Sequence, residues 1–223
     1  MPPREVPAPT LQHEERVWSE RAILIGVDEV GRGPLAGPVV AAAVAFAPYA
    51  PPVRGVRDSK TLSARQRAGL LPALRGAALA LGVAGASVRE IDRLNIRRAT
   101  CLAMHRAVLR AVGAPGFRAR ALAAGATGYR VLIDGLPQAD AGFQHEALVD
   151  GDALCYSIAA AGIIAKEVRD TLMRRLAARH PGYGWETNAG YGTAEHLRAL
   201  QERAPTPHHR RSFAPVSQYS FEV

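Results

Sequence analysis

Residues 26–40 read GVDEVGRGPLAGPVV and connect two apolar runs, 22–28 and 39–46, which we predict to be the strands of one hairpin. Two adjacent acids, Asp28 and Glu29, stand at the end of the first run, directly before a glycine-rich turn. Burying an unpaired charge is costly, so such acids normally have a partner or lie where an ion can reach them. The stretch therefore indicates a β-sheet with a polar site at the end of a buried strand.

Two details of this stretch bear on what the site is. Neighbouring residues of a strand point to opposite faces, so Asp28 and Glu29 can share a site only if the strand breaks between them, which the following glycines permit. A phosphate-binding loop is the competing interpretation. However, Gly31, Gly33 and Gly37 are spaced one residue too widely for the dinucleotide fingerprint, and a strand rather than a helix follows. We therefore favour an acidic site.

Composition restricts the class of protein. The chain has 223 residues, 48% of them hydrophobic, which is enough for one large domain with its own core. No apolar stretch reaches the roughly 18 residues of a membrane span, and the start of the chain lacks the apolar region of a secretory signal. Cys101 and Cys155 do not form a metal-spaced pair. We expect a soluble cytoplasmic protein with free thiols and no membrane association.

The charge points to a polyanionic partner. The formal net charge is +8, and Lys60 and Lys166 are the only lysines among 28 basic residues. Compositional bias explains most of the arginine excess. The two lysines that remain suggest local roles, because lysine offers a compact point charge that arginine does not.

Apolar periodicity and capping residues predict alternating helices and strands, which is typical of an α/β sandwich. We predict helices at 11–20, 64–75 after Ser63, from Ser87 to about Val112, from Ser157 to before Pro181, and near 193–203. We predict strands at 22–28, 39–46, 79–86 and 129–133. The segment 113–128 is interpreted as a flexible insertion, either a loop or a short helix within a loop.

Carboxylates follow several of the predicted strands. Asp134 ends the run 129–133, and Asp152 lies in the turn before the helix that Ser157 opens. In α/β sheets the strand ends form the ligand crevice, so these acids can meet Asp28 and Glu29 there. Their mutual repulsion requires a cation, and an all-oxygen ligand set suits Mg²⁺ or Mn²⁺ rather than zinc. Two such ions form the usual arrangement for phosphoryl transfer.

Several motifs together resemble bacterial ribonuclease HII. They keep the order of that family and cover most of residues 22–216: GVDEVGRGPLAGPVVAAAV (26–44), DSK (58–60), IDG (133–135), GD (151–152), SIAAAGIIAKEVRD (157–170), HPGYGWETNAGYGTAEHL (180–197) and PTPHHRRSF (205–213). The resemblance implies an α/β, ribonuclease H-like fold, with a central mixed β-sheet flanked by helices and a C-terminal helical and loop extension. We divide the chain accordingly into a tail with a short helix (1–20), a catalytic core (21–180) and a substrate-binding extension (181–223).

The resemblance also implies an activity. It is that of an endoribonuclease that uses two divalent ions, Mn²⁺ or Mg²⁺, to hydrolyse the RNA strand of RNA–DNA hybrids. It implies cutting at ribonucleotides embedded in duplex DNA, as in ribonucleotide excision repair, and products with 5′-phosphate and 3′-hydroxyl ends. The family's metal-binding, catalytic carboxylates fall on Asp28, Glu29, Asp134 and Asp152.

Substrate contacts are implied at other positions. The family's backbone contacts to the 2′-hydroxyl at the RNA–DNA junction fall on Gly31, Arg32 and Gly33, and its nucleotide-packing tyrosine falls on Tyr191. The 2′-hydroxyl is the group that separates RNA from DNA, and glycine lets the backbone approach it closely. We add as further expected substrate contacts the basic residues Lys60, Lys166, Arg210 and Arg211.

Alternatives remain for several polar residues. Lys166 and Asp170 lie four residues apart on one helical face, which favours a supporting ion pair over a metal contact by Asp170. Asp58 is either a turn former or a supporting residue of the site. The pair at 208–209, HH, is interpreted as part of a basic phosphate-facing surface with Arg210 and Arg211, rather than a metal site. Both tryptophans are expected to be packing residues.

Three positions depart from the commoner pattern of the family. Asp150 replaces a lysine, Ala189 replaces another lysine, and Gly162 replaces a serine on the same helical stripe as Lys166. Two positive charges are thus missing near the expected substrate path, so we expect an active enzyme with a weaker hold on its hybrid. A non-catalytic, basic RNA- or hybrid-binding protein is the alternative, but a degraded site would be expected to lose an acid early. We expect a monomer.

Overall fold

The computed structural model describes residues 8–219, so most of the predicted N-terminal tail lies outside the described residues. The strands are β1 (Ala22–Val30), β2 (Val39–Phe46), β3 (Ala78–Ala86), β4 (Gly128–Asp134) and β5 (Glu146–Leu148). They form one sheet in the order β3-β2-β1-β4-β5. β1 pairs antiparallel with β2 and parallel with β4, so the sheet is mixed and the predicted hairpin is confirmed.

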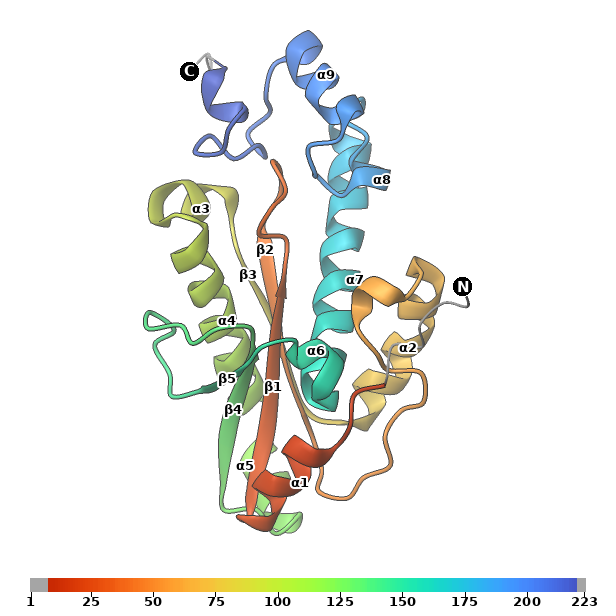
Figure 1. Cartoon of the computed structure of the whole chain (residues 1–223), viewed down its shortest axis with the longest axis vertical. Helices are drawn as coiled ribbons and strands as arrows, with labels where there is room; N and C mark the ends of the chain where they lie inside the picture. Colours follow the sequence, from red (N-terminus) through yellow and green to blue (C-terminus); the bar gives the residue numbers. More distant parts are fainter. Residues whose placement is uncertain (1–7, 220–223) are drawn as a thin grey trace.

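Helices cover both faces of this sheet (Figure 1). They are α1 (Gln12–Ser19), α2 (Ala64–Ala77), α3 (Val88–Leu94), α4 (Ile96–Val112), α5 (Phe117–Ala123), α6 (Gly151–Leu154), α7 (Tyr156–Arg179), α8 (Trp185–Asn188) and α9 (Ala194–Arg203). Two short 3-10 turns, η1 (Ser59–Thr61) and η2 (Val216–Gln218), complete the elements. Among residues 8–219, no helix is both long and apolar enough to cross a membrane.

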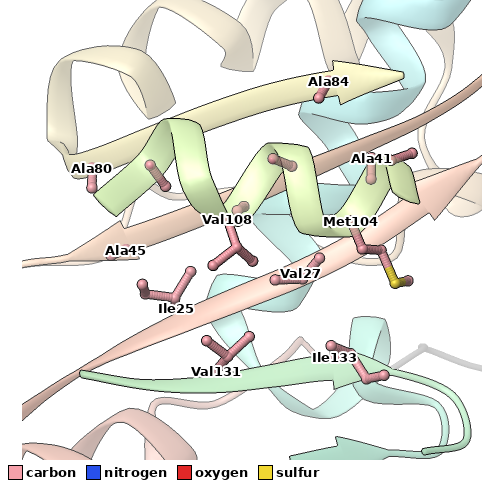
Figure 2. Packing of buried hydrophobic residues seen from close by; sticks show 14 of the residues in the cluster. Ile25, Val27, Ala41, Ala45, Ala80, Ala84, Met104, Val108, Val131 and Ile133 are labelled. Atoms are coloured by element: carbon pink, nitrogen blue, oxygen red, sulfur yellow. The ribbon is translucent and has the colours of Figure 1, made fainter. Parts of the chain in front are cut away.

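The sheet separates two apolar cores. On one face, Ile25 and Val27 of β1 pack with Met104 and Val108 of α4, and Figure 2 shows this cluster. On the other face, the alternate residues of β2 pack against α7 and α2. β1 and β2 are therefore buried on both faces, which is why they read as continuous apolar runs.

The predicted helix from Ser87 to Val112 is wrong in one respect, because the chain breaks it at Asn95. Ser87 and Glu90 form the expected capping box at the start of α3. Asn95 has φ +67°, which ends α3, and its side chain accepts a hydrogen bond from the backbone N–H of Arg98 to begin α4. This positive φ with an extended ψ is rare for a residue other than glycine, and the cap on α4 compensates for it, so one residue ends one helix and caps the next.

The segment 113–128 contains a short helix, as one of the two interpretations had it. In this helix, α5, Phe117 and Ala121 are buried in the core beneath α4. Gly116 precedes the helix with φ +73°, a conformation that favours glycine. The segment is thus packed onto the domain through its apolar side chains.

The N-terminal helix supports the longest helix of the protein. Glu14 of α1 is buried, and its Oε1 accepts hydrogen bonds from the backbone N–H of Ser157 (2.7 Å) and from the thiol of Cys155 (3.2 Å). Because Ser157 lies in the first turn of α7, the Glu14 carboxylate meets unpaired N–H groups and the positive end of the helix dipole. α1 therefore provides a cap for α7 from a distant part of the chain.

We predict that Glu14→Ala lowers the free energy of unfolding by about 1–3 kcal/mol, because it leaves the first turn of α7 without its acceptor. The measurement is chemical denaturation followed by circular dichroism. Glu15→Ala, at an exposed position of the same helix, is the matched control and should change stability by less than about 0.5 kcal/mol. Equal effects of the two substitutions would contradict the capping role.

Candidate active site

The four predicted acids come from three elements that end at one edge of the sheet. Asp28 and Glu29 lie in β1, and Asp134 is the last residue of β4. β1 and β4 are parallel, with Val27 opposite Ile133, so Asp28 and Asp134 follow neighbouring positions. Asp152, in the first turn of α6, lies close enough to raise the pKa of Asp134 by charge repulsion.

The strand does not break between Asp28 and Glu29, which was the condition set for both acids to share one site. β1 continues to Val30, with Asp28 opposite Ala42 and Glu29 opposite Ala41 of β2. Since Ala42 packs in the core beneath α7 and Ala41 in the core beneath α4, the two acids start from opposite faces. They nevertheless interact, because the charge of Glu29 raises the pKa of Asp28 and the charge of Asp134 raises the pKa of both.

The environment of these acids disfavours their charged forms. Burial is the main cause that raises the pKa of Asp28 well above its ordinary value, and repulsion from Glu29 and Asp134 adds to it. Burial likewise raises the pKa of Glu29 and of Asp134. Three carboxyl groups that are desolvated and repel one another gain stability from a bound cation.

Basic groups already neutralise part of this charge. Lys60 Nζ lies 3.0 Å from Asp152 Oδ2, and Arg32 Nη1 lies 3.3 Å from Glu29 Oε1. The backbone N–H of Gly151 donates to Asp134 Oδ1 over 2.8 Å. Lys60 therefore lies beside the acids, as expected for a residue near the substrate path.

The acids fit a divalent ion by chemistry, although their side chains are not arranged around one. Within residues 8–219, no group of three or more acidic, histidine or cysteine side chains is positioned to hold a metal ion as it stands. Asp152 and Glu29 instead pair with Lys60 and Arg32. The donors are all carboxylate oxygens, the set that Mg²⁺ and Mn²⁺ prefer, so the residues suit such ions once the side chains rotate.

Gly162 determines where the Asp28 carboxylate lies. A Cβ atom at Gly162 of α7 would lie 2.3 Å from Asp28 Oδ2, which no real contact allows. The absence of a side chain at Gly162 thus lets Asp28 approach the backbone of α7 directly. Sequence reasoning noted this departure but missed its consequence, because the contact joins residues far apart in the chain.

Two buried arginines hold the turn that follows β1. Arg169 of α7 donates from Nε, Nη1 and Nη2 to the backbone carbonyls of Pro38, Ala189 and Ala36. Arg210 donates to three carbonyls of the same turn, those of Gly31, Arg32 and Gly37. The planar, multiply donating guanidinium suits such a cluster of carbonyl oxygens better than an ammonium does.

The expectation that Arg210 lies on a phosphate-facing surface is therefore wrong. Its side chain is 0% exposed, and its donors are occupied by the turn. Burial, with a smaller effect of the nearby charge of Arg169, lowers the pKa of Arg210 to about 9, so the side chain keeps its charge at neutral pH. Arg211 is exposed, and its backbone N–H donates to Asp92.

The turn needs glycine for packing as well as for conformation. Gly31 has φ +98°, and a Cβ there would lie 2.1 Å from Arg169 Nε. A Cβ at Gly33 would lie 3.6 Å from Cε1 of Tyr191, so the tyrosine ring is in contact range of the turn. The predicted 2′-hydroxyl contacts and the predicted nucleotide-packing tyrosine are thus neighbours, although about 160 residues separate them.

The remaining predicted residues divide by their contacts. Lys166 Nζ lies 2.7 Å from Asp170 Oδ1, while Arg67 Nη2 lies 3.1 Å from Oδ2, so the supporting ion pair is confirmed and both oxygens of Asp170 have cationic partners. The Asp58 side chain accepts from the backbone N–H of Lys60, which confirms its role as a turn former. A substrate contact by Lys166 stays a prediction.

The paired histidines and the other packing residues also have defined places. His209 is buried, so it is not part of a basic surface, contrary to our expectation. Trp18 and Trp185 are both buried, as expected for packing residues. The two cysteines are free and buried.

Known proteins resemble this chain closely. The sequence model of the family described as Ribonuclease HII matches residues 25–216. The ribonuclease HII of Synechococcus sp. (strain JA-3-3Ab) is 49% identical over 215 residues, which are 95% of this chain and 91% of that protein. The ribonuclease HII of Sphingopyxis alaskensis (strain DSM 13593 / LMG 18877 / RB2256) is 51% identical over 196 residues, 88% of this chain and 91% of that protein.

A solved structure confirms the predicted ribonuclease H-like fold. The structure of Bst-RNase HIII in complex with Mn²⁺ has a TM-score of 0.67 to this chain at 21% sequence identity. It covers 89% of this chain, and the match spans 69% of that one. At this identity the likeness establishes the fold alone.

We predict that Asp28→Asn raises the melting temperature of the metal-free protein by about 2–4 °C at pH 8. A carboxyl group whose pKa is raised on folding stabilises the protein fully below about pH 4, and this stability is lost as the pH rises toward the raised value. The amide avoids that loss because it carries no charge. The measurement is thermal unfolding with and without Mn²⁺.

The same experiment distinguishes repulsion from a general surface effect. Mn²⁺ should raise the melting temperature of the wild type but not of Asp28→Asn, because a metal stabilises the state that binds it. The control is Asp140→Asn, which removes surface ion pairs to Arg97 and Arg98. It should change neither the metal-free melting temperature nor its rise with Mn²⁺. A lower melting temperature for metal-free Asp28→Asn would contradict the repulsion argument.

We further predict that Gly162→Ala reduces the rise in melting temperature produced by Mn²⁺, because the new methyl group displaces Asp28. The apparent Mn²⁺ affinity, measured by calorimetric titration, should fall about 10-fold or more. Gly69→Ala is the control, since a Cβ there meets nothing within 4 Å. An unchanged Mn²⁺ affinity in Gly162→Ala would show that the position of Asp28 is not set by this contact.

Proposed function

The chain belongs to the ribonuclease HII family, and from this membership we propose that it cuts the RNA strand of RNA–DNA hybrids and the duplex beside single embedded ribonucleotides. It is a metal-dependent endoribonuclease of the ribonuclease H type. The observation that carries the assignment of its site is the group of desolvated, mutually repelling acids at the ends of β1 and β4.

In this proposal, Asp28, Glu29, Asp134 and Asp152 hold two divalent ions. When bound, such ions supply an activated water and stabilise the leaving 3′-oxygen. The negative charges of the carboxylates would balance the positive charges of the ions. The backbone N–H of Gly151 donates a hydrogen bond to Asp134 and so fixes the orientation of its carboxylate. Lys60, which pairs with Asp152 over 3.0 Å, would be free to meet a substrate phosphate if Asp152 served as a metal ligand.

Recognition of the ribonucleotide falls to the turn after β1. The backbone of Gly31, Arg32 and Gly33 contacts the 2′-hydroxyl, and the exposed ring of Tyr191 packs against the sugar of the same nucleotide. Buried Arg169 and Arg210 support this role, because carbonyls held by two guanidinium groups leave the turn little freedom. Hydrolysis of the phosphodiester beside this ribose, with breakage of its bond to the 3′-oxygen, leaves 5′-phosphate and 3′-hydroxyl ends.

The two predicted regions contribute different parts of the proposed site. Residues 21–180 provide the acids and the turn, while residues 181–223 bring Tyr191 to the substrate and buttress the turn with Arg210. The ions are Mn²⁺ or Mg²⁺, and a structure of Bst-RNase HIII contains Mn²⁺. The enzyme acts as a monomer in the cytoplasm and needs no membrane.

The test uses duplex DNA with one embedded ribonucleotide, incubated with the protein and either Mg²⁺ or Mn²⁺. We predict cleavage by the wild type. Asp134→Asn should cleave at least about 1,000-fold more slowly, because it loses one of the carboxylates proposed to hold the two metal ions. Asp140→Asn, at the surface, should cleave at the wild-type rate.

Two outcomes would contradict the proposal in different ways. Binding of the hybrid without cleavage by the wild type would favour the alternative of a non-catalytic hybrid-binding protein. Rapid cleavage by Asp134→Asn would instead show that the acids were assigned wrongly.

A further inference from the structure

The C-terminal extension contains a buried pair of histidines. His196 lies in α9 and His209 in the loop that follows it, and their Nε2 atoms are 3.0 Å apart. Neither side chain is accessible, with exposures of 0% and 1%. Two unprotonated nitrogens at this distance would repel each other, so one of the two Nε2 atoms carries a proton.

The partners of His196 determine where its proton lies. Its Nδ1 is 2.9 Å from the backbone carbonyl oxygen of Tyr191, which can only accept a hydrogen bond. Nδ1 is therefore protonated, and Nε2 of the neutral ring is an acceptor. The indole N–H of Trp185 donates to this Nε2 over 3.1 Å, which agrees with the assignment.

His209 has the opposite tautomer. Its Nδ1 accepts a hydrogen bond of 2.9 Å from the backbone N–H of Thr206, so a neutral ring carries its proton on Nε2 and donates to His196. Each of these N–H groups then faces an acceptor, with His196 Nε2 shared between the N–H groups of Trp185 and His209, and an added proton on either ring would disrupt this arrangement. Burial, and to a smaller extent the neighbouring His196, lowers the pKa of His209 to about 3, so the pair is neutral at physiological pH.

The hydrogen bonds form a chain that ends on Tyr191. The chain runs from Thr206 through His209 and His196 to the Tyr191 carbonyl, which also accepts from the backbone N–H of Thr193 at 2.8 Å. The tyrosine side chain itself is 47% exposed and lies against the turn at Gly33. A half-exposed ring is held loosely by its own packing, so its placement depends on how its backbone is held.

We propose that His196 and His209 are positioning residues that fix Tyr191 against the 31–33 turn, each as a single neutral tautomer. The inference rests on the proposed contact between Tyr191 and the ribonucleotide. Neither histidine reaches the substrate, so each acts on recognition only through Tyr191. The pair connects α9 and the loop at 206–209 to Tyr191, the residue proposed to pack against the sugar.

A double-mutant cycle tests this coupling. kcat/KM is measured for cleavage at a single embedded ribonucleotide by His196→Leu, Tyr191→Ala and the double variant. His196→Leu should lower kcat/KM about 3- to 10-fold, the effect of one lost hydrogen bond. The double variant should be no slower than Tyr191→Ala, because the histidine acts through the tyrosine.

Matched variants separate positioning from a general loss of structure. His196→Asn places an amide N–H near the position of Nδ1 and should recover most of the lost kcat/KM. His180→Leu is the control, because its ring packs on the same aromatic cluster, 6.1 Å from Trp185, outside this chain of hydrogen bonds. It should leave kcat/KM unchanged.

Direct observation of the protons gives a second, independent test. Nitrogen NMR of the wild type between about pH 6 and 8 should show a proton on Nδ1 of His196 and on Nε2 of His209. Reversed tautomers, or charged rings, would overturn the hydrogen-bond chain. Additive losses in the cycle, or a Tyr191→Ala variant as active as the wild type, would overturn the positioning role. A wild type that does not cleave would overturn the proposed function instead. The NMR result would still show whether the hydrogen bonds through His196 and His209 are as proposed.

Discussion

The close packing of β1 on α7 is the constraint from which the site follows. Two glycines make it possible: a Cβ at Gly26 would lie 2.4 Å from the backbone carbon of Ser157, and a Cβ at Gly162 would lie 2.3 Å from Asp28 Oδ2. With strand and helix in such contact, the Asp28 carboxylate is forced into a desolvated position beside Asp134. Glu14 of α1 caps the same helix at its first turn, so the N-terminal helix stabilises the element on which the site is built.

Opposite charges are buried on the two sides of the turn after β1, and they are compensated in different ways. The acids before the turn have raised pKa values and only partial neutralisation by Lys60 and Arg32. Arg169 and Arg210 behind the turn are buried cations that are satisfied by backbone carbonyls. The carbonyl cluster satisfies the hydrogen-bonding groups of both arginines from within the protein, which restrains the turn. The acids remain under electrostatic strain, which a bound cation relieves.

The C-terminal extension packs against this turn, the proposed recognition site. The backbone N–H of Gly37 donates to His208, and that of Arg210 donates to Leu35, so the loop after α9 pairs with the turn as a short antiparallel bridge. Figure 1 shows the two segments at the same end of the molecule. This pairing places Arg210 inside the protein and lets the His196–His209 pair act on Tyr191 from behind.

By itself, the sequence determined the hairpin at 22–46, the α/β class, the capping of α2 and α3 by Ser63 and Ser87, and which acids gather at the strand ends. These features depend on local periodicity, on caps a few residues apart, and on motifs that keep one order along the chain. Only the tertiary structure decided that β1 runs unbroken past Asp28 and Glu29, that Gly162 makes room for Asp28, and that Arg210 and His209 are buried. β1 continues because it pairs with β2 up to Val30, and the decisive contacts of Gly162 with Asp28 and of Arg210 with Gly31 each join residues more than 100 positions apart. The physical reason is that burial and hydrogen-bond partners are properties of the packed chain. The sequence alone does not distinguish an arginine exposed at the surface from one that is buried and bonded to the carbonyls of a turn.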